Sequence, residues 1–175
     1  MTDLPKINSF KNLSVIVHGP YWTLYEATRR DTDTRHLLQV LNPQLSSDHN
    51  FVYEFENLWH YNKGLRHSSI LTPQSLEITE HYHVLIYDYF QSQSLRNVLD
   101  SQIPILERQV ASLSKHAAAA LQYAQIRGIK HGWLRPEFIL LSKYIYEIKL
   151  FGFGSEYFFE QLYPANEQQK KQFAE

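Results

Sequence analysis

Residues 123–141 read YAQIRGIKHGWLRPEFILL, and this stretch is the best indicator of the fold. The segment leading into it, from Glu107 to Ile126, has apolar residues at near-helical spacing, namely Val110, Leu113, Ala117, Leu121 and Ala124. Gly128 follows at the place where a glycine ends a helix and turns the chain. The pattern therefore predicts a long helix that delivers the following residues as a loop.

That loop resembles the catalytic loop of protein kinases, whose pattern is H-R-D-L-K-P-x-N-I-L-L. The likeness is carried by His131, Leu134, Pro136, Glu137, Ile139, Leu140 and Leu141. Further along, residues 148–154 read IKLFGFG and resemble the kinase strand that ends in D-F-G. Because the motifs occur in the family's order, the resemblance implies a kinase-like frame.

Three positions depart from the family where it keeps its chemistry. Trp133 replaces the acidic base, Phe138 replaces the metal-binding Asn, and Gly152 replaces the Asp that holds magnesium. In phosphoryl transfer a carboxylate takes the substrate proton, while an Asp and an Asn hold the metal ions. An indole, a phenyl ring and a glycine can do neither. Glu137 matches a glutamate of ordinary kinases, so we expect it to have a structural role beside Arg135.

The residues that would hold a nucleotide are also changed. Residues 36–41, HLLQVL, resemble the kinase V-A-I-K strand, with Gln39 in place of the Lys, so the charge that anchors a triphosphate is missing. Leu37 stands where the family keeps a small Ala against the adenine ring. The resemblance places Leu24 above and Leu140 below the same cavity. We expect these three leucines to pack together as an apolar plug.

Residues 17–27, VHGPYWTLYEA, align with the glycine-rich phosphate loop of the family, yet only Gly19 is kept. Pro20 removes one backbone N–H, and Trp22 adds the largest side chain. Trp22 is expected either to fill or cover the cleft or to be an ordinary strand residue packed on its lobe. Both interpretations oppose nucleotide binding. Tyr87 falls at the gatekeeper position, where it narrows the back of the cleft.

Residues 51–59, FVYEFENLW, are expected to form the family's regulatory helix. Either Glu54 or Glu56 takes the place of the Glu that pairs with the kinase Lys. Glu54 is preferred, because Leu58 then lies one turn later, where the family has an apolar packing residue. With Gln39 as the partner, no ion pair can form.

The resemblance implies an α+β, protein kinase-like fold in two lobes. Residues 1–90 are expected to form a five-stranded antiparallel sheet with one helix and turns at residues 31–33 and 81–82. Residues 91–175 are expected to form a partial, mainly helical second lobe, since the sequence ends soon after the D-F-G-like position. Two interpretations stay open. Either the chain is a truncated module whose long helix exposes apolar surface that favours a homodimer or a partner, or it is the front part of a longer product.

Composition indicates a folded, soluble chain, with 43% hydrophobic and 20% charged residues. The formal net charge of −1 favours neither nucleic acid nor an acidic membrane as a partner. The sequence has no apolar run that could cross a bilayer and no signal peptide, so a cytoplasmic location is expected. With no cysteine, and with His81 and His83 lacking a third ligand, no metal site is expected.

These patterns predict a catalytically inactive pseudokinase that binds no ATP, needs no cofactor and serves as a protein-binding scaffold or regulator. A nucleotide-binding sensor that needs no metal is the first alternative. The second is an atypical transferase with relocated residues, which requires a cluster of acidic side chains in the cleft. The candidates for that cluster are Asp88 and Glu54 or Glu56.

Overall fold

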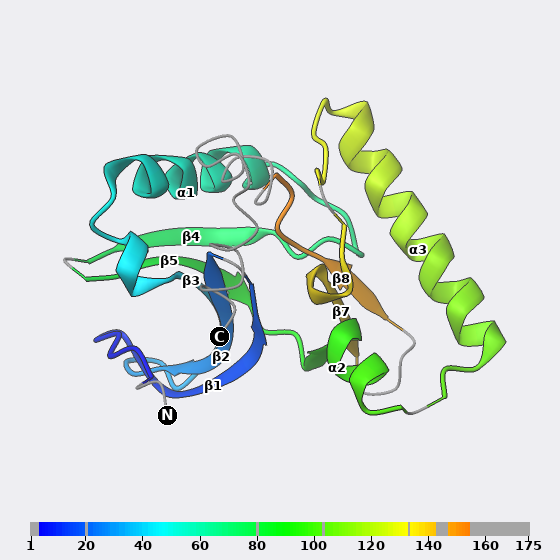
Figure 1. Ribbon diagram of the computed structural model, residues 1–175, viewed down its shortest axis with the longest axis horizontal. Helices are drawn as coiled ribbons and strands as arrows, with labels where there is room; N and C mark the ends of the chain where they lie inside the picture. The colour runs from blue at the N-terminus through cyan, green and yellow to red at the C-terminus, as the bar shows by residue number, and fades with distance from the viewer. Residues whose placement is uncertain are drawn as a thin grey trace.

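The computed structural model describes residues 4–19, 21–79, 81–102, 104–132, 134–142 and 147–154. Figure 1 shows a curved sheet with one helix, α1, lying over it, and a second lobe of helices and short strands beside the sheet. The predicted α+β fold, with a five-stranded antiparallel first lobe, is confirmed.

The first lobe is a sheet in the order β1-β2-β3-β5-β4, in which every neighbouring pair is antiparallel. Its strands are β1 (Phe10–His18), β2 (Trp22–Arg29), β3 (Arg35–Leu41), β4 (Pro73–Ile78) and β5 (His83–Asp88). Leu24 pairs with Gln39, and Leu37 pairs with Tyr87. Because side chains alternate along a strand, this register sets Trp22 and Leu24 on the same face as Leu37 and Gln39.

Both predicted turns join antiparallel neighbours. In the first, Arg29 N–H donates to Thr34 O at 2.8 Å, and Asp33 has a left-handed φ of 53°, which aspartate tolerates better than most residues. In the second, Thr79 N–H donates to Tyr82 O at 2.8 Å. Short connections of this kind hold adjacent strands in register.

The helix of the first lobe, α1 (His49–Asn62), follows the short 3₁₀ turn η1 (Pro43–Leu45) and is longer at both ends than the predicted segment 51–59. Asp48 caps its N-terminus by accepting a hydrogen bond from Asn50 N–H at 2.9 Å. Its buried residues, Phe51, Phe55, Leu58 and Asn62, follow the spacing of one helical face. That face packs on the sheet.

The second lobe combines helices with a small sheet. Its helical elements are α2 (Leu95–Asp100), α3 (Glu107–Ile126) and the 3₁₀ turn η2 (Pro136–Phe138). Its strands, β6 (Ser92–Ser94), β7 (Ile139–Ser142) and β8 (Ile148–Leu150), form an antiparallel sheet in that order. The bounds of α3 agree with the prediction, and Gly128 adopts a left-handed φ of 74° just after the helix.

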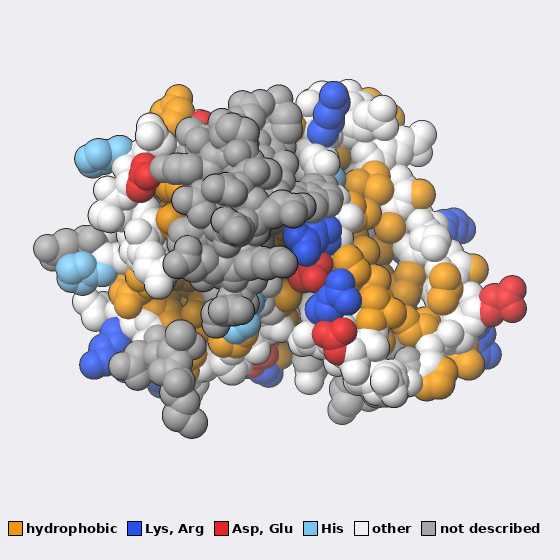
Figure 2. All heavy atoms as spheres, in the orientation of Figure 1, with side chains coloured by type: hydrophobic (Ala, Val, Ile, Leu, Met, Phe, Trp, Pro, Cys, Tyr) orange, Lys and Arg blue, Asp and Glu red, His pale blue; other side chains and the backbone are white. Residues whose placement is uncertain are grey.

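The long helix α3 is only partly covered. Ala120 and Ala124 are its buried residues, whereas Val110 is 47% exposed and Ile126 is 75% exposed. Figure 2 shows hydrophobic atoms along the part of this face where α3 lies. Within the described part of the chain, α3 and the other helices are too short or too polar to span a membrane.

Candidate functional site

The cleft between the lobes is the site that the sequence motifs indicated. Strands β2, β3 and β5 contribute to it from the first lobe, and η2, β7 and the residue after β8 contribute from the second. Their inward side chains belong to one buried hydrophobic cluster that includes Trp22, Leu24, Leu37, Tyr87, Phe138, Leu140 and Phe151. The core of the first lobe therefore continues without a break into the second.

Three aromatic rings meet across the lobes, and we call them the aromatic bridge: Trp22, Phe138 and Phe151. The Trp22 ring centroid lies 5.4 Å from that of Phe138 and 5.3 Å from that of Phe151. Phe138 and Phe151 are 5.5 Å apart. Trp22 and Phe151 are 0% exposed and Phe138 is 1% exposed. Distances of this size are typical of attractive aromatic pairs, so the bridge joins the lobes directly.

Gly19 makes room for the indole of the bridge. A Cβ at this position would lie 2.5 Å from Cε2 of Trp22, which is too close for any side chain. The Gly19 N–H also donates to the Trp22 carbonyl at 2.8 Å. The one glycine kept from the family's phosphate loop thus lies against Trp22. Pro20 lies outside the described residues.

Leu24, Leu37 and Leu140, the three leucines expected to form an apolar plug, are each 0% exposed. All three belong to the cluster that contains the aromatic bridge. They come from β2, β3 and β7, and they therefore pack from both lobes. These three side chains therefore expose no surface that a ligand could contact in this structure.

Gln39 is held by the gatekeeper residue. The Tyr87 hydroxyl donates to Gln39 Oε1 at 2.6 Å, and burial raises the pKa of Tyr87 above its ordinary value. Gln39 is 0% exposed, and its Nε2 has no hydrogen-bond partner among the described residues. A neutral amide tied to a tyrosine offers no cation to a phosphate group.

Neither Glu54 nor Glu56, the expected candidates for the family's Lys-pairing Glu, lies on the buried face of α1. Both are half-buried, and Glu54 Oε2 accepts a hydrogen bond from Asn57 Nδ2 at 3.2 Å. Phe55 and Leu58 occupy the buried face instead and join the cluster of the cleft. Leu58, the packing residue expected one turn after Glu54, is 1% exposed, and which of the two glutamates takes the family position stays a prediction. The helical spacing of the buried residues decides which side chains turn inward.

His131 packs at the base of the loop, as expected. Its ring centroid lies 5.2 Å from that of Phe138 and 4.8 Å from that of Phe153. Its Nε2–H donates to Phe151 O at 3.1 Å, which makes Nδ1 the unprotonated nitrogen. Burial lowers the pKa of His131 to about 4. The ring is therefore neutral near pH 7. Trp133, two residues later, lies outside the described residues.

Glu137 is engaged in ion pairs and is not free to act as a base. Arg96 Nε donates to its Oε1 at 3.0 Å, and Arg135 Nε lies 3.6 Å from its Oε2. Burial acts to raise the pKa of Glu137, but hydrogen bonds and the two arginine charges outweigh it, so the pKa is lowered. The expected structural role beside Arg135 fits these contacts, and Arg96 is an additional partner.

Three residues that matter for the cleft were not predicted. Phe151 completes the aromatic bridge, and the sequence feature that could have indicated it is its position directly before Gly152 in the D-F-G-like motif. Asn62 donates from Nδ2 to Phe153 O at 2.9 Å, so α1 is tied to the segment that resembles D-F-G. Asn97 in α2 donates from Nδ2 to Ile16 O in β1 at 3.1 Å, which is a second bond between the lobes. No local sequence pattern indicates these two long-range bonds.

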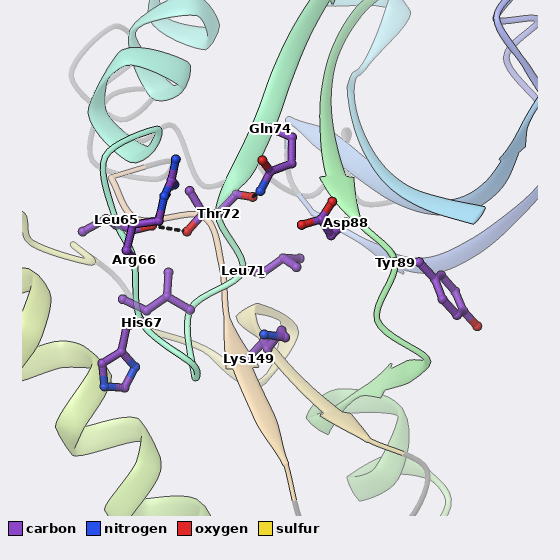
Figure 3. A pocket seen from close by; sticks show the side chains of 10 residues that line it. Leu65, Arg66, His67, Leu71, Thr72, Gln74, Asp88, Tyr89 and Lys149 are labelled. Carbon is purple, nitrogen blue, oxygen red and sulfur yellow. Dashed lines mark hydrogen bonds between the residues drawn. The ribbon is translucent and has the colours of Figure 1, made fainter. Parts of the chain in front are cut away.

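The acidic cluster required for a relocated active site is not assembled in the described part of the cleft. Asp88 lines a different cavity of about 180 Å3, where Figure 3 shows it near Gln74, with Lys149 on the opposite wall. Lys149 Nζ donates to Ser68 O at 2.9 Å, so the ammonium group of this lysine is already bound to a backbone carbonyl. Among the described residues, no three His, Asp or Glu side chains are placed to hold a metal ion.

Gly152 has a left-handed φ of 74°, a conformation that glycine adopts without strain. It supplies no side chain to the cleft, and its neighbours Phe151 and Phe153 are both 0% exposed. The described groups at the sequence-predicted positions are thus rings, leucines, a bound amide and a glycine. Such groups stabilise a core, and the amide oxygen among them, Oε1 of Gln39, already accepts a hydrogen bond from Tyr87.

Comparison with known proteins gives a consistent result. A family model described as the protein kinase domain matches residues 10–172. The chain is 28% identical over 149 residues to mitogen-activated protein kinase kinase 10 of Arabidopsis thaliana, covering 85% of this chain and 47% of the relative. It is 27% identical over 146 residues to the serine/threonine-protein kinase ULK3 of Mus musculus, covering 79% of this chain and 29% of the relative. The chain spans less than half the length of both relatives.

Solved kinase structures share the fold. The PknI kinase domain of Mycobacterium tuberculosis is similar with a TM-score of 0.66 and 22% identity, covering 87% of this chain and 62% of that chain. Rad53 in complex with AMP-PNP is similar with a TM-score of 0.66 and 19% identity, covering 83% of this chain and 38% of that chain. At these identities the likeness concerns the fold alone.

Proposed function

The chain belongs to the protein kinase domain family, and from this premise we propose that it is a catalytically inactive member. In this proposal it binds no ATP, needs no cofactor and works by binding another protein, as a scaffold or regulator. The relatives named above are kinases by name, but the motif departures of this chain argue against the same chemistry here.

The aromatic bridge is the observation that carries the proposal. In the family resemblance, Trp22 belongs to the phosphate loop, Phe138 takes the place of the metal-binding Asn, and Phe151 precedes the place of the magnesium Asp. Their ring centroids are 5.3 to 5.5 Å apart. Side chains in mutual contact leave no room for phosphates between them, and carbon rings cannot replace oxygen ligands to magnesium.

The lack of positive charge at the altered positions of the cleft supports the same proposal. Transfer of a phosphoryl group depends on cations that neutralise the phosphate oxygens. Gln39 is neutral and bound to Tyr87, and His131 is neutral near pH 7 because burial lowers its pKa. No described side chain at the altered positions would compensate the charge of a triphosphate that displaced the bridge.

A protein-binding role draws support from the surface of the second lobe. Leu106 is 51% exposed at the start of α3, and Val110 and Ile126 on the helix are also largely exposed. Apolar side chains exposed on a helix favour association with another protein surface. A second copy of this chain and a different protein are both compatible with such a helix, and sedimentation of the purified protein distinguishes self-association from a monomer.

A thermal-shift titration tests the proposed lack of nucleotide binding. The purified chain is heated with ATP, ADP or GTP at millimolar concentration, with and without magnesium. Ligand binding to the folded state raises the melting temperature, and a ligand at 100 times its Kd adds about 2.7 kcal/mol. For a chain of this size that corresponds to a rise of about 5 to 10 °C. We expect no rise.

Two variants make the titration specific to the bridge. Trp22→Ala opens the space beside Phe138, and Tyr53→Ala alters a side chain on α1 that is 63% exposed. Neither variant is expected to bind magnesium-ATP, because the ligands to the metal stay absent. A saturable rise in the unmodified chain without magnesium would overturn the proposal and favour a metal-independent sensor. A rise that requires magnesium would also overturn it and reopen the question of catalysis.

A further inference from the structure

A hollow at the N-terminal end of the sheet is separate from the residues of the cleft. It has a volume of about 700 Å3 and is lined by the segment before β1, by the first residues of β1 and by Arg30. Its two sides are joined by a hydrogen bond from Arg30 N–H to Ser9 O at 3.0 Å. Figure 1 shows the N-terminal segment beside the hairpin that follows β2. We call this hollow the N-terminal groove.

The floor of the N-terminal groove is apolar. Ile7 is 2% exposed and Phe10 is 1% exposed, and both belong to the core cluster on this side of the sheet. Leu13 packs against the same cluster, while Leu4 at the rim is 50% exposed. Ile7 and Phe10 thus back the groove but expose almost no surface of their own, so an apolar side chain from outside would contact Leu4 and the partly buried Leu13. The volume lies within the range of about 300 to 1,000 Å3 that is typical of binding pockets.

The charged residues that line the N-terminal groove in the described part of the chain are all positive. They are Lys6, Lys11 and Arg30, and no described Asp or Glu belongs to the lining. Lys11 is neutralised by Asp33, at a distance of 2.6 Å from Nζ to Oδ1. The side chains of Lys6 and Arg30 form no hydrogen bond or ion pair with any described residue, unlike the adjacent Arg29, which pairs with acidic side chains. In a chain of formal net charge −1, this is a local excess of positive charge.

The backbone at the N-terminal groove does not favour the addition of a strand. β1 is an edge strand, but its register with β2 shifts between Lys11 and Ser14, and Asn12 has a left-handed φ of 56°. Irregularities of this kind protect sheet edges from pairing with another strand. A partner is therefore expected to bind here through its side chains.

We propose that the N-terminal groove binds a short acidic segment of a partner protein. An apolar side chain of that segment lies against Leu4 and Leu13, and its carboxylates face Lys6 and Arg30. Opposite charge increases the association rate and selects the partner, while burial of the apolar side chain supplies affinity. This inference rests on the proposed protein-binding role but not on the filled cleft.

Fluorescence anisotropy tests the inference with the full chain. The probe is a short fluorescein-labelled peptide in which glutamate and leucine alternate, and the matched probe has glutamine at every glutamate position. We expect saturable binding of the acidic probe that weakens with added sodium chloride, and no saturable binding of the neutral one. The groove variant combines Lys6→Glu with Arg30→Glu. The control variant combines Arg108→Glu with Lys115→Glu on α3, which changes the net charge equally.

The groove variant is expected to lose at least about tenfold in affinity, a difference of about 1.4 kcal/mol, while the control variant keeps its affinity. Equal losses in both variants would overturn the inference, since they would indicate a general charge effect. Complete displacement by millimolar inorganic phosphate, or binding to anionic vesicles without binding to the peptide, would also overturn it. Absence of peptide binding, together with no thermal shift by nucleotide, would refute this groove and leave the proposed function intact.

Discussion

Removal of the Trp22 indole is the most direct test of the aromatic bridge. Trp22→Ala deletes a fully buried ring that contacts Phe138 and Phe151 from the opposite lobe. If the ring holds the lobes together, its loss destabilises the whole chain. If Trp22 only covers an otherwise independent first lobe, the effect on the second lobe is small.

The expected magnitude follows from burial and contacts. Replacing a buried Trp by Ala typically costs about 3 to 5 kcal/mol in free energy of unfolding, because the ring's transfer energy is lost and a cavity remains. Each aromatic pair adds about 0.5 to 1.5 kcal/mol beyond burial. The Trp22 Nε1 has no hydrogen-bond partner among the described residues, so its removal recovers about 1 kcal/mol of that loss. A net loss of about 3 to 7 kcal/mol corresponds to a fall in Tm of about 6 to 28 °C.

Urea unfolding followed by circular dichroism measures this loss, because the signal does not depend on the deleted tryptophan. Tyr53→Ala is the control, since this side chain is 63% exposed and its truncation is expected to change stability by less than about 0.5 kcal/mol. A double-mutant cycle with Phe138→Ala is expected to give a coupling energy of about 0.5 to 1.5 kcal/mol. A loss below about 1 kcal/mol for Trp22→Ala, or no coupling with Phe138, would refute the bridge.

Three further predictions concern single groups of the site. Because burial lowers the folded-state pKa of His131 to about 4 from an ordinary 6.5, the unfolded chain takes up this proton first. The stability that neutral His131 provides is complete above pH 6.5 and declines by roughly 3 kcal/mol as the pH falls to 4. In His131→Gln, the free energy of unfolding measured with urea should therefore depend less on pH across that interval. Gln39→Leu leaves the buried Tyr87 hydroxyl without its acceptor and should cost about 1 to 3 kcal/mol, whereas adding Tyr87→Phe should restore most of the loss, as measured by chemical denaturation. Gly152→Ala places a Cβ on a residue with φ of 74° and should cost about 1 kcal/mol by calorimetry, whereas Gly64→Ala, with open space around it, should cost less.

Local patterns were sufficient for the main elements and for the altered motif positions. The spacing of Val110, Leu113 and Ala117 predicted α3 with its observed bounds, because a helix repeats over neighbouring residues. The departures at Gln39, Phe138 and Gly152 could be read directly, since side-chain chemistry depends on residue type alone. Within α1, Leu58 was expected to pack and is buried, whereas the choice between Glu54 and Glu56 for the family position stays a prediction.

The sequence by itself determined that this chain has a kinase-like α+β fold and that the positions resembling kinase catalytic residues lack acids, an amide and a lysine. Only the tertiary structure decided which side chains meet one another in the cleft. Trp22 meets Phe151, Asn62 bonds to a carbonyl 91 positions away, and Asn97 bonds to one 81 positions away. Contacts of this kind depend on how the two lobes close on each other. Sequence periodicity shows which side of an element is apolar, but packing alone selects the side chain that it meets.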